Sequence, residues 1–208
     1  TTILQKPKLP PPTEIQKDGL TDFVGAVTDG RTGAVAFDFI SPHDKTEARK
    51  AWFFFEDDYA CLGTAIRSDR RWPVVTTVNQ VLLRSAVTVN RDHRPQQLPE
   101  GERELDRVKW VHHDRIGYLF PRPATVHVSN QTEQGRWSDI TDEKNVSDRL
   151  VSKDVFMLWL DHGPQPRHAS YQYIVVPDVD MPELQATADS NRHIDILSNT
   201  ADIQAVMH

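Results

Sequence analysis

The sequence of 208 residues contains a single cysteine, Cys61. One cysteine excludes an internal disulfide framework and a zinc site built from several cysteines. No run approaches the ~20 apolar residues that a membrane-spanning helix requires. The longest apolar runs, residues 51–55 and 155–160, have the length of strands. We therefore expect no membrane partner.

A surplus of basic residues is also absent. Lysine and arginine number 24 against 30 aspartate and glutamate residues, which gives a net charge of −6. This balance argues against a protein that grips a polyanion by bulk charge, so we expect no nucleic-acid partner. Any contact with an acidic polysaccharide would have to be made by a small local group of residues. The sequence shows no initiator methionine and no signal peptide, and we expect it to be a fragment of a longer protein.

Helical periodicity is scarce, and short strand-like runs dominate. The proline run at residues 10–12 predicts an extended strap over residues 1–20. From Asp22 onward, short β-branched and aromatic runs separated by turn residues predict an all-β, antiparallel sandwich domain over residues 21–208. The predicted strands are residues 23–27, 34–39, 51–55, 59–66, 74–83, 86–89, 108–112, 117–120, 125–128, 155–160, 171–176, 193–197 and 203–206.

Two short helical segments are predicted, at residues 44–50 and 181–188, the second opened by Pro182. The polar stretches at residues 91–106 and 132–153 are typical of surface excursions.

The run from Arg67 to Pro73 is the most informative candidate site. Arg70, Arg71 and Trp72 lie in a predicted loop, where the indole can stack on a sugar ring and the guanidinium groups can pair with carboxylate or sulfate. The alternative is a solvated turn in which Trp72 packs its edge against the sheet.

Other clusters favour structural roles. His112 and His113 are adjacent on a predicted strand and point to opposite faces, so they cannot share one metal ion. His162 follows an aspartate, but no serine or cysteine elbow accompanies it. We predict no metal site, no cofactor and no catalytic triad. The turn at residues 56–58 carries three carboxylates, which could hold calcium but are more typical of a solvated turn.

Several side chains are predicted to be packing residues. Cys61 lies in an apolar strand and is expected to be a buried, inert thiol. Tyr171 and Tyr173 share one face of a strand. The tryptophans inside strand patterns are expected in the core; they are Trp52, Trp110 and Trp159.

Several runs, taken in order, carry a resemblance that spans nearly the whole chain. They are FVGAV (23–27), ARKAWFFF (48–55), CLGTAI (61–66), TTVNQ (76–80), WVHHD (110–114), IGY (116–118), DHG (161–163) and ASYQY (169–173). In this order they resemble the central β region of the family 8 polysaccharide lyases, which include chondroitin AC and ABC lyases, hyaluronate lyases and xanthan lyases.

The resemblance implies a β-supersandwich of the galactose-mutarotase type, placed between an N-terminal α/α-toroid and a small β domain. It implies a secreted or periplasmic parent lyase that cleaves uronate-containing polysaccharide, such as chondroitin or hyaluronan, by β-elimination. In this family the catalytic Asn, His, Tyr and Arg lie mainly on the toroid. A further Glu and Asn come from strands that precede the segment matched here. The resemblance therefore places no catalytic residue on residues 1–208, and the expected partners are the toroid and an acidic polysaccharide.

Two alternatives remain. The chain could be a carbohydrate-binding or scaffold domain without catalytic activity. It could also be an aldose-mutarotase-like enzyme, which would require a histidine and a carboxylate on one concave face.

Overall fold

A computed structural model describes residues 20–41, 44–92, 94–141, 144–190 and 194–208. The proline run predicted to form a strap lies outside these residues. The described strands are β1 (Val24–Thr28), β2 (Gly33–Ile40), β3 (Glu47–Phe54), β4 (Tyr59–Arg67), β5 (Pro73–Leu82), β6 (Thr88–Arg91), β7 (Arg94–Gln97), β8 (Gly101–His113), β9 (Ile116–Gly135), β10 (Val151–Pro164), β11 (Ala169–Val176), β12 (Asp195–Asn199) and β13 (Gln204–Met207). A 3₁₀ turn, η1 (Trp137–Asp139), and one helix, α2 (Met181–Asp189), join them.

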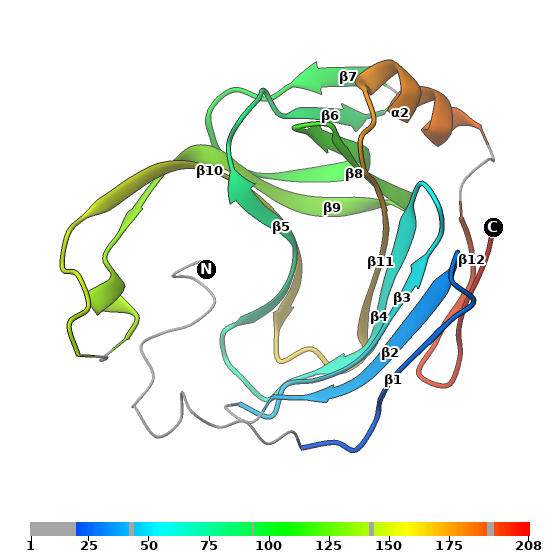
Figure 1. The fold of residues 1–208 in the computed structure, drawn as a ribbon. Coiled ribbons are helices and arrows are strands. Elements are labelled where there is room, and N and C mark those ends of the chain that lie inside the picture. The colour runs from blue at the N-terminus through cyan, green and yellow to red at the C-terminus, as the bar shows by residue number, and fades with distance from the viewer. Residues whose placement is uncertain (1–19, 42–43, 93, 142–143, 191–193) are drawn as a thin grey trace.

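Eleven strands form one antiparallel sheet, and β12 and β13 form a separate hairpin. The main path runs β1-β2-β3-β4-β11-β9-β8-β6-β7, and β10 links β9 to β5. Figure 1 shows that this sheet curls into a deep trough, with β5 and β10 facing the layer of β1 to β4. Antiparallel strands and this curvature confirm the predicted all-β sandwich.

Strand β9 holds the two layers together. Its first residues, 117–119, pair with β11, whereas residues 127–135 pair with β10. Between them lie Pro121 and Pro123, in a stretch where the register of β8 against β9 shifts. A proline donates no ladder hydrogen bond, so it is tolerated at such a bulge, where the strand turns from one partner to another.

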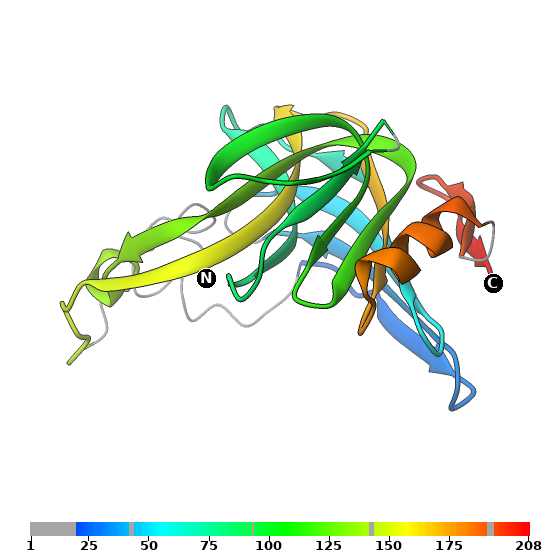
Figure 2. The same cartoon turned by 90° about the horizontal axis from the view of Figure 1, so that it is seen from above.

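The concave face of the trough holds the larger core. Side chains from β4 and β11, such as Cys61 and Tyr173, meet side chains from β9 and β10, such as Val128 and Phe156. A second cluster lies on the convex face, where α2 and the hairpin cover the sheet (Figure 2). It includes Trp110, Ile174 and Leu184, which are fully buried. Burial of these apolar faces is the main stabilising contribution to the fold.

Two predictions about local structure were wrong. Residues 44–50 do not form a helix, because Glu47–Phe54 is strand β3, paired with both β2 and β4. Pairing on both sides outweighs a weak local helical preference. The separate strands predicted at 117–120 and 125–128 are parts of the single strand β9. The polar stretches at 91–106 and 132–153 are mostly exposed, as predicted, and they include β7, the start of β8, the end of β9 and the start of β10.

Other predictions are confirmed. The Asp29–Gly30 turn joins β1 to β2, and residues 56–58 join β3 to β4. The helix α2 begins after the N-cap Asp180, whose side chain accepts a hydrogen bond from the backbone of Glu183, and Pro182 lies in its first turn.

Candidate functional site

The loop at residues 68–72 joins β4 to β5 and lies beside the β10–β11 loop. The backbone N–H of Ser68 donates to the carbonyl of Pro166 at 3.0 Å, and the N–H of Gln165 donates to the carbonyl of Arg70 at 3.1 Å. The Ser68 hydroxyl is buried and lies 3.0 Å from the Thr46 hydroxyl. Because both strands and the neighbouring loop fix it, this loop presents its side chains from a defined backbone.

The arginines of this region are not equivalent. Arg67 pairs with Glu47, with Nε 2.7 Å from the carboxylate. Arg70 pairs with Asp44 at 2.7 Å. Burial would raise the pKa of Asp44, but hydrogen bonds from Thr46, Ser41 and Arg70 outweigh it, and the pKa is lowered. The guanidinium of Arg70 is therefore neutralised by an internal partner.

Arg71 and Trp72 differ from Arg70. Arg71 is exposed and makes no ion pair with any residue that the structure describes. The Trp72 side chain is 72% exposed, so it does not pack its edge into the sheet. The structure thus divides the predicted trio: Arg71 and Trp72 are available to a ligand, and Arg70 stabilises the loop.

The adjacent histidines on β8 have separate environments. His112 contacts the carbonyl of Val179 at 3.0 Å through Nε2. His113 is buried, stacks on Phe156 and accepts a hydrogen bond from the backbone of Arg84. Burial lowers the pKa of His113. Within the described ranges, no group of three or more His, Cys, Asp or Glu side chains is arranged to hold a metal ion.

The cluster around Tyr171 is a packed part of the core. The His162 ring stacks on Tyr171, and its Nε2 lies 2.8 Å from the Thr76 hydroxyl. Burial raises the pKa of Tyr171 and lowers the pKa of His162, so both are neutral near pH 7. A neutral phenol with a raised pKa is a poor general base. This supports the packing role predicted from the sequence.

The remaining predictions of burial agree with the structure in most cases. Cys61 is buried, and burial raises the pKa of its thiol to about 12. Trp110 is fully buried, and Trp52 is half-buried and packs against the core. Trp159 is half-buried and stacks on His127 outside both core clusters, so its predicted place in the core was wrong. Tyr173 is buried beside Tyr171.

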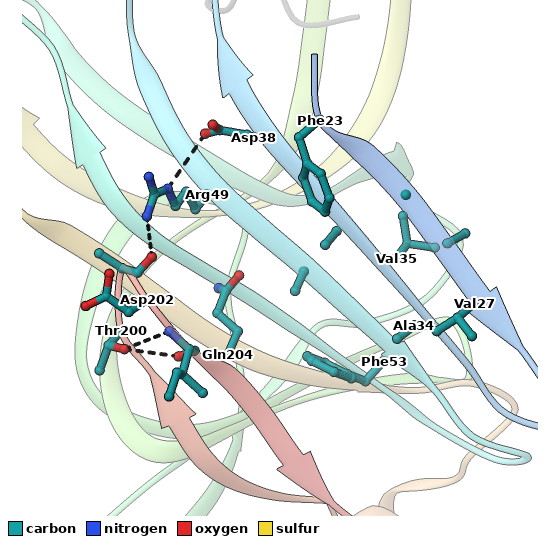
Figure 3. A pocket seen from close by; sticks show the side chains of 16 residues that line it. Phe23, Val27, Ala34, Val35, Asp38, Arg49, Phe53, Thr200, Asp202 and Gln204 are labelled. Atoms are coloured by element: carbon teal, nitrogen blue, oxygen red, sulfur yellow. Dashed lines mark hydrogen bonds and ion pairs between the residues drawn. The ribbon is translucent and has the colours of Figure 1, made fainter. Parts of the chain in front are cut away.

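A groove of about 650 Å³ lies on the convex face, between β1 to β3 and the tip of the β12–β13 hairpin (Figure 3). Its floor is made of small apolar side chains, and Phe23 and Val27 are exposed along its side. The Arg49 guanidinium bridges Asp38 on β2 and the carbonyl of Ala201 in the hairpin. With few free polar groups, the groove suits protein packing better than recognition of a sugar.

The sequence did not indicate this groove. Its lining combines strands that are near in sequence with a hairpin more than a hundred residues away, at 200–204. Alternation along β2 and β3 could have placed Ala34, Ala36 and Ala51 on one face. Nothing in the pattern would have placed the hairpin over that face.

The chain is similar to known proteins over most of its length. The model of the family "Polysaccharide lyase family 8, super-sandwich domain" matches residues 1–188. Chondroitinase-AC of Pedobacter heparinus is 36% identical over 197 residues, which are 92% of this chain and 27% of that protein. Xanthan lyase of a Bacillus species is 30% identical over 187 residues, which are 85% of this chain and 20% of that protein.

The fold agrees with this relationship. The solved structure of chondroitinase AC lyase, from a study of its oligosaccharide complexes, superposes with a TM-score of 0.79 at 36% identity. The match covers 89% of this chain and 27% of that one. The chain therefore spans about a quarter of the length of these relatives. It belongs to polysaccharide lyase family 8, and residues 1–188 match the super-sandwich domain of that family.

Proposed function

We propose that this chain is the β-supersandwich part of a lyase that cleaves uronate-containing polysaccharide, such as chondroitin or hyaluronan, by β-elimination. In that reaction a base removes the proton at C5 of the uronate while its carboxylate is neutralised. The electron pair forms the C4–C5 double bond, and the bond from C4 to the glycosidic oxygen breaks. The oxygen leaves with a proton, and no water or cofactor is consumed.

The role of this chain in that lyase is support of the substrate cleft. The base and the neutralising groups are proposed to lie on an N-terminal toroid outside residues 1–208. Family membership and the coverage of about a quarter of the relatives support this division. The interior of the sandwich supports it as well, because its tyrosines and its thiol have raised pKa values and are neutral. A secreted or periplasmic location is part of this proposal. No described helix is long and apolar enough to cross a membrane.

The β4–β5 loop is proposed to border the cleft and touch the polymer. The observation that carries this is the pair of Arg71, which has no acidic partner among the described residues, and Trp72, which is exposed on a fixed backbone. A guanidinium can bind the carboxylate or sulfate of the polymer, and an indole face can stack on a pyranose ring.

Kinetics of the full natural polypeptide test the loop. Unsaturated-uronate absorbance is followed on a panel of acidic polysaccharides. We expect Arg71→Ala and Trp72→Ala each to raise KM severalfold. The double variant Arg70→Ala/Arg71→Ala should raise it further if Arg70 also meets the polymer. Arg31→Ala is the matched control, because Arg31 pairs with Glu56 at the opposite end of β4. Unchanged kinetics of the loop variants would exclude the loop from the cleft.

The alternative function is a carbohydrate-binding or scaffold domain without catalytic activity. The intact mass of the natural gene product separates the two. A mass several times 23.8 kDa supports the lyase. A natural product limited to residues 1–208 would remove the toroid and leave the binding domain as the function.

A further inference from the structure

Two segments of the sequence have the form Asn-X-Ser/Thr with X other than proline, which is the acceptor pattern for N-linked glycans. One begins at Asn130 and the other at Asn145. In this pattern the asparagine Nδ2 receives the glycan, and the transferase also recognises the hydroxyl two positions later. Because the glycan is bulky and hydrophilic, a folded protein can carry it only at its surface.

The site at Asn130 is enclosed by the sheet. Asn130 lies on β9, where its register partners are Gly101 on β8 and Phe156 on β10. Strands therefore flank it on both sides, and only 6% of it is exposed. Thr132, which supplies the hydroxyl, belongs to the same strand. A glycan on Asn130 would disrupt the packing around Phe156, so we expect folded molecules to carry none there.

The site at Asn145 is open to solvent. Residues 144–150 form neither helix nor strand, and Asn145 and Ser147 are both exposed. The φ angle of Asn145 is 68°, a left-handed conformation that asparagine adopts more readily than most other residues. The Ser147 hydroxyl accepts a hydrogen bond from the backbone N–H of Arg149 at 3.2 Å. Both side chains that define this acceptor site are therefore at the surface of the folded chain.

Contacts with η1 hold this segment at the outer end of a long excursion. Figure 2 shows that the far ends of β9 and β10 project away from the two layers of the sandwich. There the Ser138 hydroxyl donates to the Asp148 carboxylate at 2.6 Å, and Nε of Arg136 lies 4.0 Å from the same carboxylate. The acceptor site thus lies on a defined turn, away from the core that a glycan would disturb.

We infer that Asn145 is an acceptor for an N-linked glycan when the polypeptide is exported. The donor is an oligosaccharide linked to a polyprenyl pyrophosphate. Nδ2 of Asn145 forms a bond to C1 of the first sugar and gives up a proton, the bond from C1 to the pyrophosphate oxygen breaks, and the polyprenyl pyrophosphate leaves. The inference rests on the proposed secreted or periplasmic location, and it is independent of lyase activity.

The glycan is expected to leave the β4–β5 loop uncovered. Strand β10 begins at Val151, close to the acceptor site, and ends at Pro164. Pro164 pairs with Pro73, the first residue of β5 after that loop. The acceptor site and the loop are therefore at opposite ends of β10.

Mass spectrometry of the full natural polypeptide, secreted from yeast, tests the inference. Peptide:N-glycosidase in heavy-oxygen water converts each glycosylated asparagine into an aspartate that carries the heavy isotope. We expect the label at residue 145 and none at residue 130. Secreted protein without a label at residue 145 would overturn the inference, and a label at residue 130 would contradict the argument from burial. The readout does not involve lyase activity, so a negative result leaves the proposed lyase function intact.

Variants of the hydroxyl residues assign the site. Ser147→Ala retains Asn145 and should abolish the label, whereas Ser147→Thr retains a hydroxyl and should preserve it. Because Ser147 is exposed, neither variant is expected to prevent folding. Thr132→Ala is the matched control at the buried site and should leave the glycan mass of the secreted protein unchanged. A label that persists in Ser147→Ala, or is lost in Ser147→Thr, would contradict the inference.

Discussion

The two ends of strand β5 satisfy polar groups in opposite ways. At the Pro73 end, the loop at residues 68–72 is held by backbone bonds to the β10–β11 loop, and Arg70 is paired with Asp44. At the Leu82 end, Asn130 is buried and its carbonyl oxygen has no partner in the described structure. The first end combines a backbone fixed by hydrogen bonds with the exposed side chains of Arg71 and Trp72. The second keeps an unsatisfied group inside, at the expense of stability. Substitutions at the two ends are therefore expected to have opposite effects.

The largest effect is expected at Gly63 on β4, the strand that leads into the first end. A Cβ at this position would lie 2.0 Å from Cε1 of the buried Tyr171 ring. Neither strand β4 nor strand β11 can move freely, since both are central in the sheet. We expect Gly63→Ala to lower the free energy of unfolding by about 3 kcal/mol, measured by urea denaturation.

Gly25→Ala provides the comparison for that variant. The nearest atom to a Cβ at Gly25 is 3.9 Å away, in the Phe23 side chain. We expect a change within about 0.5 kcal/mol. Equal losses for the two variants would show that the close approach of Tyr171 is not what requires glycine.

At the second end, by contrast, a substitution is expected to increase stability. Asn130→Leu should raise the free energy of unfolding by about 1 kcal/mol, because the desolvation of an unpaired amide is removed and apolar contact with Phe156 is gained. Chemical denaturation measures this. A loss of stability would mean that the amide is satisfied in solution, for example by an ordered water.

Arg70 and Arg71 provide a smaller contrast within one loop. Arg70→Ala removes an ion pair that is partly exposed, so we expect a loss of about 0.5 kcal/mol. Arg71→Ala should leave stability unchanged, because its guanidinium has no described partner. Thermal melts of the two variants check that Arg70, and not Arg71, stabilises the loop. A lower melting temperature for Arg71→Ala than for Arg70→Ala would contradict this.

The pH dependence of stability in acid tests the contribution of Asp44, the carboxylate that pairs with Arg70. The pKa of Asp44 is lowered in the folded protein from its ordinary value of 3.8. The unfolded chain therefore binds a proton at a higher pH than the folded one. The stabilisation is complete above the unfolded pKa and is lost as the pH falls through the folded pKa. In Asp44→Asn, the unfolding free energy should depend less steeply on pH below about 4 than in the unchanged protein. Parallel curves would contradict this.

Local sequence signals account for much of the fold. The Asp29–Gly30 turn, the hairpin of β3 and β4, and the helix after Asp180 follow from turn and capping residues that act within a few positions. The family could be identified because ordered runs extend along the chain. Loop 68–72 was placed correctly, since arginines, serine and aspartate before Pro73 are typical of a loop.

The parts that escaped prediction depend on distant partners. Separate strands were predicted at residues 117–120 and 125–128, but β9 continues through Pro121 and Pro123, where the register of β8 against β9 shifts. Residues 44–50 looked helical, and only the flanking strands β2 and β4 make them extended. The pairing of Arg70 with Asp44 joins different segments of the chain. The unsatisfied amide of Asn130 is a property of its surroundings, so the sequence contains no signal for it.

The pairing of β4 with β11 has a consequence for how the chain folds. These strands are neighbours in the sheet, yet the whole segment from β5 to β10 separates them in sequence. Within this segment, β1 to β4 are synthesised before β11, and the edge of β4 that pairs with β11 stays open until β11 appears. Closure of such distant pairs is slow, and open edges associate with other chains. Truncation before β11 would therefore leave β4 unpaired on one side, and such a fragment is expected to aggregate.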